Sequence, residues 1–193
     1  MSTDVHKNNE ALLRPWRVLA SRLLLDRRPW LRVEEQDVVL PNGQTIRGYL
    51  LAPARDYATV FAVTSDGRVP LVRQYKHGIG RVAVDLPAGY LEGADEPPVA
   101  CARRELAEET GLVSNRWQHL ATLPVDTNRG PTAVHAFLAR EARMDATPHL
   151  DETESLLCEF HTLAEVERMV RRGEITSVAS VACALLALRE LGR

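Results

Sequence analysis

Residues 104–112 read Arg-Glu-Leu-Ala-Glu-Glu-Thr-Gly-Leu and contain the pattern that decides how this chain folds. Glu105, Glu108 and Glu109 stand at positions i, i+3 and i+4, so on an α-helix they share one side. At about 100° per residue, the apolar stripe of this helix is made by Val99, Ala102, Leu106 and Thr110. Glu105 and Glu109 fall on the shoulder of that stripe, where contact with water alone does not explain them.

Two interpretations of these acids are open. In the first, they form a solvated face on which Arg104 and Glu108 make an i, i+4 ion pair worth only about 0.3–0.5 kcal/mol. In the second, they bind a hard divalent cation, Mg²⁺ or Mn²⁺, which prefers oxygen ligands. Glu108 and Glu109 lie in the last helical turn, where the helix dipole disfavours a negative charge by roughly 0.3–1 kcal/mol. Repulsion between Glu105 and Glu109 adds to this cost, so we favour the metal interpretation.

The helix that carries this stretch is predicted to begin near Glu96 and to end at Gly111. Asp95 or Glu96 is the expected N-cap, two prolines follow in the first turn, and glycine commonly ends a helix. Upstream, Leu86-Pro87-Ala88-Gly89 leaves a strand for an irregular loop. Its backbone carbonyls and amides can face the same ion and its ligand, although an ordinary turn has a similar composition.

The rest of the chain combines strand-like and helix-like segments. Two hairpins are expected around Asn42-Gly43 and Asp66-Gly67, because these pairs supply the positive φ angles of tight turns. Their strands span residues 30–40, 45–52, 57–64 and 69–75, further strands are expected at 82–86, 117–123, 133–138 and 156–161, and helices at 163–172 and 178–191. This order predicts an α+β fold, or a layered α/β/α sandwich, rather than a doubly wound parallel sheet.

The composition limits the classes of function. The chain has 193 residues, of which 45% are hydrophobic and 26% charged, and this balance fits one globular domain with an appendage. A formal charge of −2 argues against nucleic acid as a partner. Three separated cysteines without a CxxC pair argue against a disulfide framework and a structural zinc site, and indicate a reducing cytoplasmic location. We expect no secretory signal and no membrane span.

Gly89, Glu96 and residues 104–112 together resemble the signature of the Nudix hydrolases, in which a glycine and a glutamate precede an REUxEExGU run at set spacing. Six residues rather than the usual five separate Gly89 from Glu96, so the loop carries one extra residue. The segment from Leu71 to Lys76 and the tail from Leu150 onward look like the ADP-ribose pyrophosphatase branch of that family.

The resemblance implies a fold and a domain organisation. The fold would be the Nudix α/β/α sandwich with a mixed sheet, formed by residues 55–193. An N-terminal antiparallel hairpin extension, residues 1–54, would exchange between subunits. The resemblance therefore implies a homodimer.

The resemblance also implies roles for the acids of the helix. In that branch, metal ions are held by helix glutamates and by a loop carbonyl, which correspond here to Glu105, Glu109 and the carbonyl of Ala88. Glu108 would support these ligands, and Arg104 would orient the glutamates.

A second acidic cluster, Asp151-Glu152-Thr153-Glu154, stands just before the strand expected at residue 156. Alternating acids on a loop can reach a metal-bound phosphate, but an ordinary surface loop can have the same composition. In the pyrophosphatases a loop glutamate acts as the base and a glutamate two residues later contacts the metal. The resemblance thus implies Glu152 as the general base and Glu154 as a metal ligand.

The implied activity is hydrolysis of the pyrophosphate bond of ADP-ribose or a related nucleoside diphosphate sugar, such as GDP-mannose. The products would be a nucleoside monophosphate and a sugar phosphate, with Mg²⁺ as cofactor and Mn²⁺ as a substitute. The alternative is a Nudix-fold sensor or scaffold that binds nucleotides without turnover. The candidate substrate-binding residues are Gly89, Arg73 and Trp30.

Two of these candidates have alternative roles. Arg73 either contacts the diphosphate or pairs with a surface acid. Trp30, like Trp16, either stacks on adenine, packs at the dimer interface or packs in the core, which is the more common role of tryptophan.

Overall fold

The computed structural model describes residues 13–93, 95–149 and 155–193. The chain divides into two compact units, and each is considered by itself. Unit 1 contains the described residues up to Ala54 together with Asp126–Thr132, and unit 2 contains Arg55–Val125 and Ala133–Arg193.

Unit 1 is built on a three-stranded antiparallel sheet in the order β1-β2-β3. Its strands are β1 (Arg17–Arg27), β2 (Leu31–Val39) and β3 (Thr45–Leu51). The predicted hairpin between β2 and β3 is present, but its turn is not the predicted two-residue turn. Gly43 has a positive φ of 86° whereas Asn42 does not, and the N–H of Gly43 donates to the carbonyl of Leu40 at 2.9 Å. Strand β1 is not among the strands expected from the sequence.

The segment Asp126–Thr132 belongs to unit 1 because hydrogen bonds attach it there. The hydroxyl of Tyr49 donates to the carbonyl of Asn128 at 2.7 Å. The N–H of Ala54 donates to Oγ1 of Thr132 at 2.8 Å. Unit 1 is therefore discontinuous in sequence.

Unit 2 contains a mixed sheet in the order β7-β4-β10-β8, with β9 also paired to β10. These strands are β4 (Tyr57–Thr64), β7 (Ala88–Tyr90), β8 (Leu112–Val113), β9 (Arg116–Pro124) and β10 (Ala133–Met144). Strands β4 and β10 are parallel, and the other pairs are antiparallel. Strand β7 occupies part of the stretch expected to be an irregular loop. Strand β10 continues past its expected end through an irregularity at Glu141, which has a φ of 54°.

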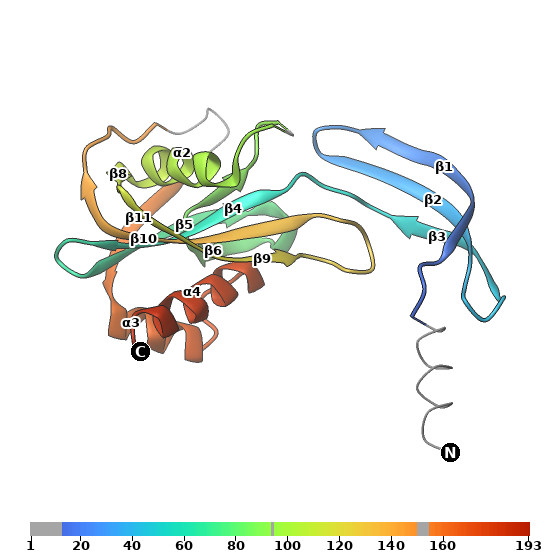
Figure 1. Cartoon of the computed structure of the whole chain (residues 1–193). Coiled ribbons are helices and arrows are strands. Elements are labelled where there is room, and N and C mark those ends of the chain that lie inside the picture. Colours follow the sequence, from blue (N-terminus) through green and yellow to red (C-terminus); the bar gives the residue numbers. More distant parts are fainter. Residues whose placement is uncertain (1–12, 94, 150–154) are drawn as a thin grey trace, which may run out of the picture. The chain divides into compact units, whose positions relative to one another are not determined.

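Helices cover both faces of this sheet (Figure 1). Helix α2 (Pro98–Thr110) lies on one face, and α3 (Leu163–Arg171) and α4 (Val178–Glu190) lie on the other. Each face has its own buried core, which includes Val60, Ala102, Leu106 and Phe137 next to α2, and Phe61, Leu71, Leu138 and Leu188 next to α3 and α4. The predicted α/β/α layering with a mixed sheet is confirmed, as are the N-terminal antiparallel strands.

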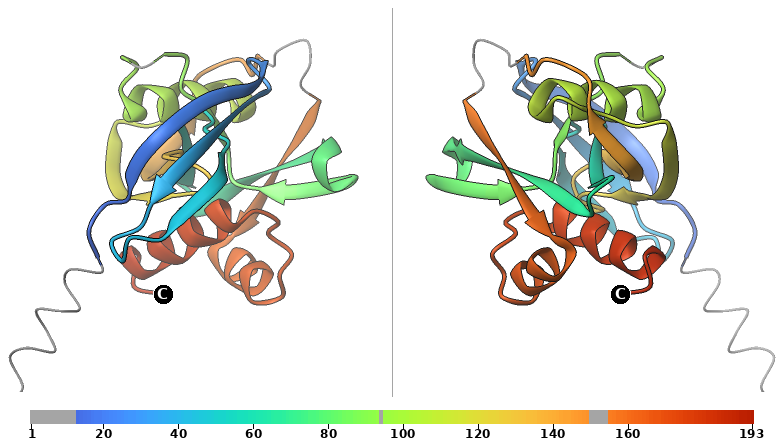
Figure 2. Two further views of the ribbon diagram at one scale, coloured as in Figure 1. Left: turned by 90° about the vertical axis from the view of Figure 1, so that its right-hand side faces the viewer. Right: turned by 90° about the vertical axis from the view of Figure 1, so that its left-hand side faces the viewer.

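A second antiparallel sheet, in the order β11-β5-β6, splays away from the mixed sheet within unit 2 (Figure 2). It consists of β5 (Arg68–Lys76), β6 (Arg81–Asp85) and β11 (Leu156–Thr162), with the 3₁₀ helix η1 (His77–Ile79) between β5 and β6. Strands β7 and β11 both approach helix α2. The carboxylate-bearing helix is therefore flanked by one strand from each sheet.

Helix α2 ends as predicted but begins differently. Gly111 has a φ of 73°, and its N–H donates to the carbonyl of Ala107 at 2.9 Å. At the start, Pro97 is the N-cap residue and no side chain caps the helix. The prediction of Asp95 or Glu96 as the cap is therefore wrong, because the fixed backbone of proline sets the start of the helix.

Two further properties of the described residues concern the cysteines and the helices. Cys101, Cys158 and Cys183 are all free thiols. None of the helices in the described ranges combines the length and the apolar character that a bilayer crossing requires.

Candidate active site

The carboxylate face of α2 contains two buried acids and one exposed acid. Glu105 and Glu109 each expose only 7% of their surface, whereas the side chain of Glu108 is 39% exposed. A buried carboxylate needs hydrogen bonds, a cation or a metal ion to offset the cost of its desolvation. Leu106 and Thr110 are buried on the same helix, so Glu105 and Glu109 lie at the edge of the core, as the sequence pattern predicts.

Strand β7, which precedes α2, packs directly on these two acids. A Cβ atom built on Gly89 would overlap the carboxylate of Glu105, so a larger residue fits only if that carboxylate moves. The N–H of Ala88 donates to Oε2 of Glu109 at 3.0 Å. The structure thus brings together Ala88, Gly89, Glu105 and Glu109, four of the residues that the sequence singles out.

Arg104 is the centre of an ion-pair network between the helix and the loop. Its Nη1 lies 2.6 Å from Oε1 of Glu105 and 3.2 Å from Oε2 of Glu108. Its Nε lies 3.3 Å from Oε1 of Glu96, and its Nη2 donates to the carbonyl of Tyr90 at 3.1 Å. Burial alone lowers the pKa of Arg104, but the hydrogen bonds to Glu96 and Glu105 outweigh burial and raise it. The guanidinium therefore stays charged and fixes the carboxylates around it.

Strand β11 presents Cys158 to the acids of α2. Burial is the main cause that raises the pKa of the Cys158 thiol to about 11, and the negative charge of Glu109 is the second cause. Leu157, the residue before Cys158 on β11, is paired with Arg73 of β5. Since successive strand residues point to opposite faces, Arg73 lies on the face away from Cys158. There its Nη1 pairs with Glu159 at 3.3 Å, so the structure does not bring Arg73 to the carboxylates.

Lys76 is a candidate that the sequence reasoning missed. It lies three residues after Arg73 on β5, so it points to the other face, the one that carries Cys158. Its Nζ donates to Oε1 of Gln74 on the same face. The two-residue period of a strand predicts from the sequence that Arg73 and Lys76 point to opposite faces of β5. Only the pairing with β11 shows which of the two faces carries Cys158.

The profile of the NUDIX domain matches residues 53–179. This chain belongs to the Nudix family. A second profile, the nucleoside diphosphate sugar hydrolase N-terminal domain, matches residues 16–50. The resemblance to the Nudix hydrolases that rests on Gly89, Glu96 and residues 104–112 is therefore confirmed.

Nudix relatives from two bacteria are known as ADP-ribose pyrophosphatases. The protein from Mycobacterium tuberculosis (strain ATCC 25618 / H37Rv) is 36% identical over 124 residues, which cover 64% of this chain and 60% of the relative. The protein from Bacillus subtilis (strain 168) is 32% identical over 141 residues, which cover 72% of this chain and 75% of the relative. A solved structure described as an ADP compounds hydrolase matches with a TM-score of 0.80 at 21% sequence identity, covering 93% of this chain and 95% of that chain. This structural likeness shows a shared fold.

The predicted Nudix site also includes Glu152, Glu154 and Trp30. Glu152 and Glu154 are outside the described residues. Trp30 belongs to unit 1 and is 86% exposed, so of the three roles open to it, packing in the core is ruled out. Trp16 is 44% exposed and contacts Tyr49 edge-on, with 5.7 Å between the ring centroids.

Nudix hydrolases generally depend on divalent metal ions. Within residues 13–93, 95–149 and 155–193, no three or more His, Cys, Asp and Glu side chains gather as a metal site. The predicted set contains only two such described side chains, Glu105 and Glu109, because its other members are a backbone carbonyl and Glu154. Two buried carboxylates packed against the backbone of Ala88 and Gly89 form a set of oxygen donors, which suits a hard divalent cation. The described residues of the site therefore fit a divalent metal ion.

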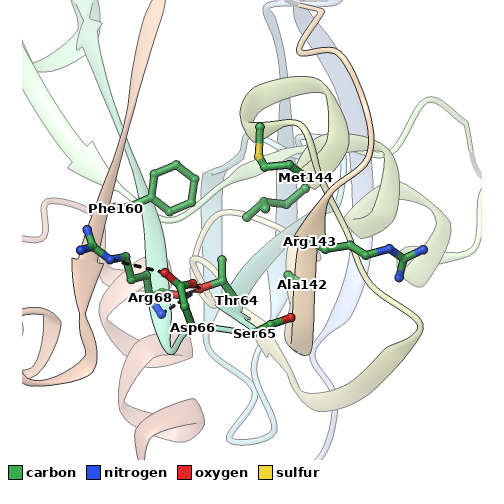
Figure 3. A pocket seen from close by; sticks show the side chains of 9 residues that line it. Thr64, Ser65, Asp66, Arg68, Ala142, Arg143, Met144 and Phe160 are labelled. Atoms are coloured by element: carbon green, nitrogen blue, oxygen red, sulfur yellow. Dashed lines mark hydrogen bonds and ion pairs between the residues drawn. The ribbon is translucent and has the colours of Figure 1, made fainter.

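A separate cavity of about 480 Å³ lies beside the turn between β4 and β5 (Figure 3). Phe160 and Met144 lie on one side of it and Thr64 and Asp66 on the other, while the side chain of Arg143 extends away. The polar groups here already pair with one another, since the Thr64 hydroxyl donates to Asp66 at 2.5 Å. Among the predicted site residues that the structure describes, none lines this cavity. We therefore place the candidate site at α2 and strand β7, which precedes it.

Proposed function

We propose that this protein hydrolyses the pyrophosphate bond of ADP-ribose or a related nucleoside diphosphate sugar in a divalent-metal-dependent reaction. The observation that carries the proposal is the packing of the buried Glu105 and Glu109 against Ala88 and Gly89. An acid that only faces solvent gains nothing from being buried in this way, whereas a metal ligand needs close packing to hold its carboxylate in place. The family match and the two ADP-ribose pyrophosphatases support this activity.

The proposed metal ligands are Glu105, Glu109, Glu154 and the carbonyl of Ala88, with Mg²⁺ as the cofactor and Mn²⁺ as its substitute. When bound, the metal neutralises phosphate oxygens and polarises the attacking water. Arg104 holds Glu105 in one orientation through the 2.6 Å ion pair, and Glu108 supports Arg104 from the exposed side. Gly89 leaves the space that the carboxylate of Glu105 occupies.

The other residues act on the water and the substrate. Glu152 is the proposed general base: it accepts a proton from the water whose oxygen bonds to phosphorus as the bridging P–O bond breaks. Lys76, on the face of β5 that carries Cys158, supplies positive charge toward the diphosphate. Each product then carries one phosphate group. A Glu152→Gln variant tests the base, since an unaltered rate and pH profile would remove Glu152 from the mechanism.

The substrate class is more specific than the family assignment and is part of the proposal. The matched region spans 60% of the length of the Mycobacterium tuberculosis relative, so the substrate of that protein is carried over as a proposal. A match to the nucleoside diphosphate sugar hydrolase N-terminal domain favours a nucleotide joined to a sugar over a nucleoside triphosphate. The decisive experiment is a panel of nucleotide sugars, dinucleoside polyphosphates and nucleoside triphosphates, assayed with Mg²⁺ and with Mn²⁺. We expect the largest kcat/KM for ADP-ribose or another nucleoside diphosphate sugar; binding without turnover would instead support a nucleotide sensor.

We also propose that residues 1–54 mediate a homodimer. Unit 1 exposes a set of large apolar side chains, namely Trp16, Val18, Leu19, Leu23, Leu24 and Leu31. Exposed apolar surface of this extent is typical of protein interfaces. Light scattering after gel filtration should give a dimer, and a Leu19→Glu/Leu24→Glu variant should give a monomer. A native monomer with full activity would contradict the proposal.

A further inference from the structure

Three successive residues of strand β7, which precedes α2, are each held by a side chain of that helix. The N–H of Ala88 donates to Glu109 at 3.0 Å, and the carbonyl of Tyr90 accepts from Arg104 at 3.1 Å. Between them, the carbonyl of Gly89 accepts a hydrogen bond from the thiol of Cys101, with 3.3 Å between Sγ and the oxygen. Glu109 and Arg104 are already part of the proposed site. Cys101 has no role in it so far.

The middle residue, Gly89, pairs with Ala58 of β4, which supports its peptide from one side. Gly89 must be glycine, because a Cβ there would overlap the carboxylate of Glu105. Glycine restricts its own backbone least, so the two peptide planes that flank Gly89 depend on neighbouring groups to hold them. The first of these planes contains the carbonyl of Ala88. A contact that fixes the second plane therefore limits the positions open to the first.

Cys101 is suited to provide that contact. It lies on the buried side of α2 and exposes none of its surface. Arg104 Nη2 lies 3.5 Å from the same sulfur, so the thiol is held between the guanidinium and the Gly89 carbonyl. We propose that Cys101 is a positioning residue that fixes the Gly89 peptide and thereby orients the carbonyl of Ala88 toward the metal. This inference rests on the proposed function, since it assigns the Ala88 carbonyl to the metal.

The competing explanation is that Cys101 only fills space in the core. The two explanations differ in what a hydrogen-bond donor at this position contributes. Cys101→Ala removes the donor, whereas Cys101→Ser keeps a donor on a side chain of similar shape. Cys183 provides a matched control, because it is equally buried but its sulfur lies 3.7 Å or more from the carbonyls of Phe137 and Thr59. Cys183→Ala therefore measures the general cost of deleting a buried thiol.

The experiment measures Mn²⁺ affinity by titration of the full chain, with kcat, KM and the thermal midpoint recorded for each variant. Because a thiol is a weak donor, we expect Cys101→Ala to weaken Mn²⁺ binding about three- to tenfold with little change in KM. Cys101→Ser should recover most of that loss. Cys183→Ala should lower the thermal midpoint but leave Mn²⁺ affinity unchanged. Equal Mn²⁺ affinities in Cys101→Ala and Cys183→Ala, or no recovery in Cys101→Ser, would overturn the inference.

A metal-free measurement separates this inference from the proposed function. In the metal-free protein, Cys101→Ala should shift the NMR resonances of the Gly89 carbonyl and the Tyr90 amide, and Cys101→Ser should return them toward their original positions. Unchanged resonances in Cys101→Ala would disprove the contact whatever the activity. If the unaltered protein neither binds Mn²⁺ nor hydrolyses any nucleotide, the proposed function fails, while shifted resonances still establish the contact.

Discussion

Replacing Gly89 with alanine tests the site through a single methyl group. The new Cβ would overlap the carboxylate of Glu105, whose nearest oxygen must then move by about 1.4 Å to reach an ordinary contact distance of 3.4 Å. Glu105 is 7% exposed and held by Arg104 at 2.6 Å, so little space is open to it. A displacement of about 1 Å at a catalytic group can cost about 10²-fold in rate. We therefore expect Gly89→Ala to lower kcat/KM for ADP-ribose by about 10²-fold.

The same change should have a small effect on stability. The φ angle of Gly89 is outside the left-handed region, so alanine causes no backbone strain there, and the atom that must move is the end of a side chain. We expect the thermal midpoint to fall by less than about 5 °C. Gly93→Ala is the matched control: it lies between β7 and α2, and its Cβ would meet nothing within 4 Å. Native activity in Gly89→Ala, or equal losses in both variants, would refute the role given to Glu105.

Three other predictions concern the acids and the core. Glu109→Gln should keep the fold and lower kcat by about 10²–10³-fold, because it removes the charge of a proposed metal ligand. The surface variant Glu167→Gln should not change kcat. Stopped assays with Mg²⁺ and with Mn²⁺ measure kcat for both variants. Burial alone raises the pKa of Glu96, but hydrogen bonds from the Glu92 N–H and from Arg104 outweigh burial and lower that pKa below its usual 4.5. The Glu96 carboxylate therefore stabilises the fold above about pH 4.5, and this contribution is lost as the pH falls through the lowered pKa. Urea unfolding should accordingly show Glu96→Gln less stable than the native chain at pH 7, with a difference that shrinks in acid; a constant difference would contradict the linkage. Leu106→Ala, at a fully buried position of α2, should lower the free energy of unfolding by about 2–5 kcal/mol, and a loss below about 1 kcal/mol would show that the helix packs less tightly than described.

The helix that carries the acids was predictable because its pattern is local. Leu106 and Thr110 mark the buried stripe, and the carboxylates of Glu105 and Glu109 follow from it by the helical period. The end of the helix was equally clear, since Gly111 adopts the positive φ that other residues rarely adopt.

The parts that were not predicted depend on distant contacts or weak patterns. The side chain of Glu96 binds Arg104 and the N–H of Glu92, so it does not cap the helix, which starts at Pro98 after Pro97 as the N-cap residue. Strand β1 has apolar residues at consecutive positions and little burial, so it lacks the alternation that marks a strand. The face occupied by Arg73 depends on the pairing of β5 with β11, more than 80 residues later in the chain.

The most direct test of the proposed activity is analysis of the products formed from ADP-ribose in ¹⁸O-labelled water with Mg²⁺. We predict AMP and ribose 5-phosphate, with one labelled oxygen in the phosphate group of one product, and almost no product from Glu109→Gln. Absence of cleavage across the nucleotide panel with either metal would contradict this prediction. So would unchanged product formation by Glu109→Gln.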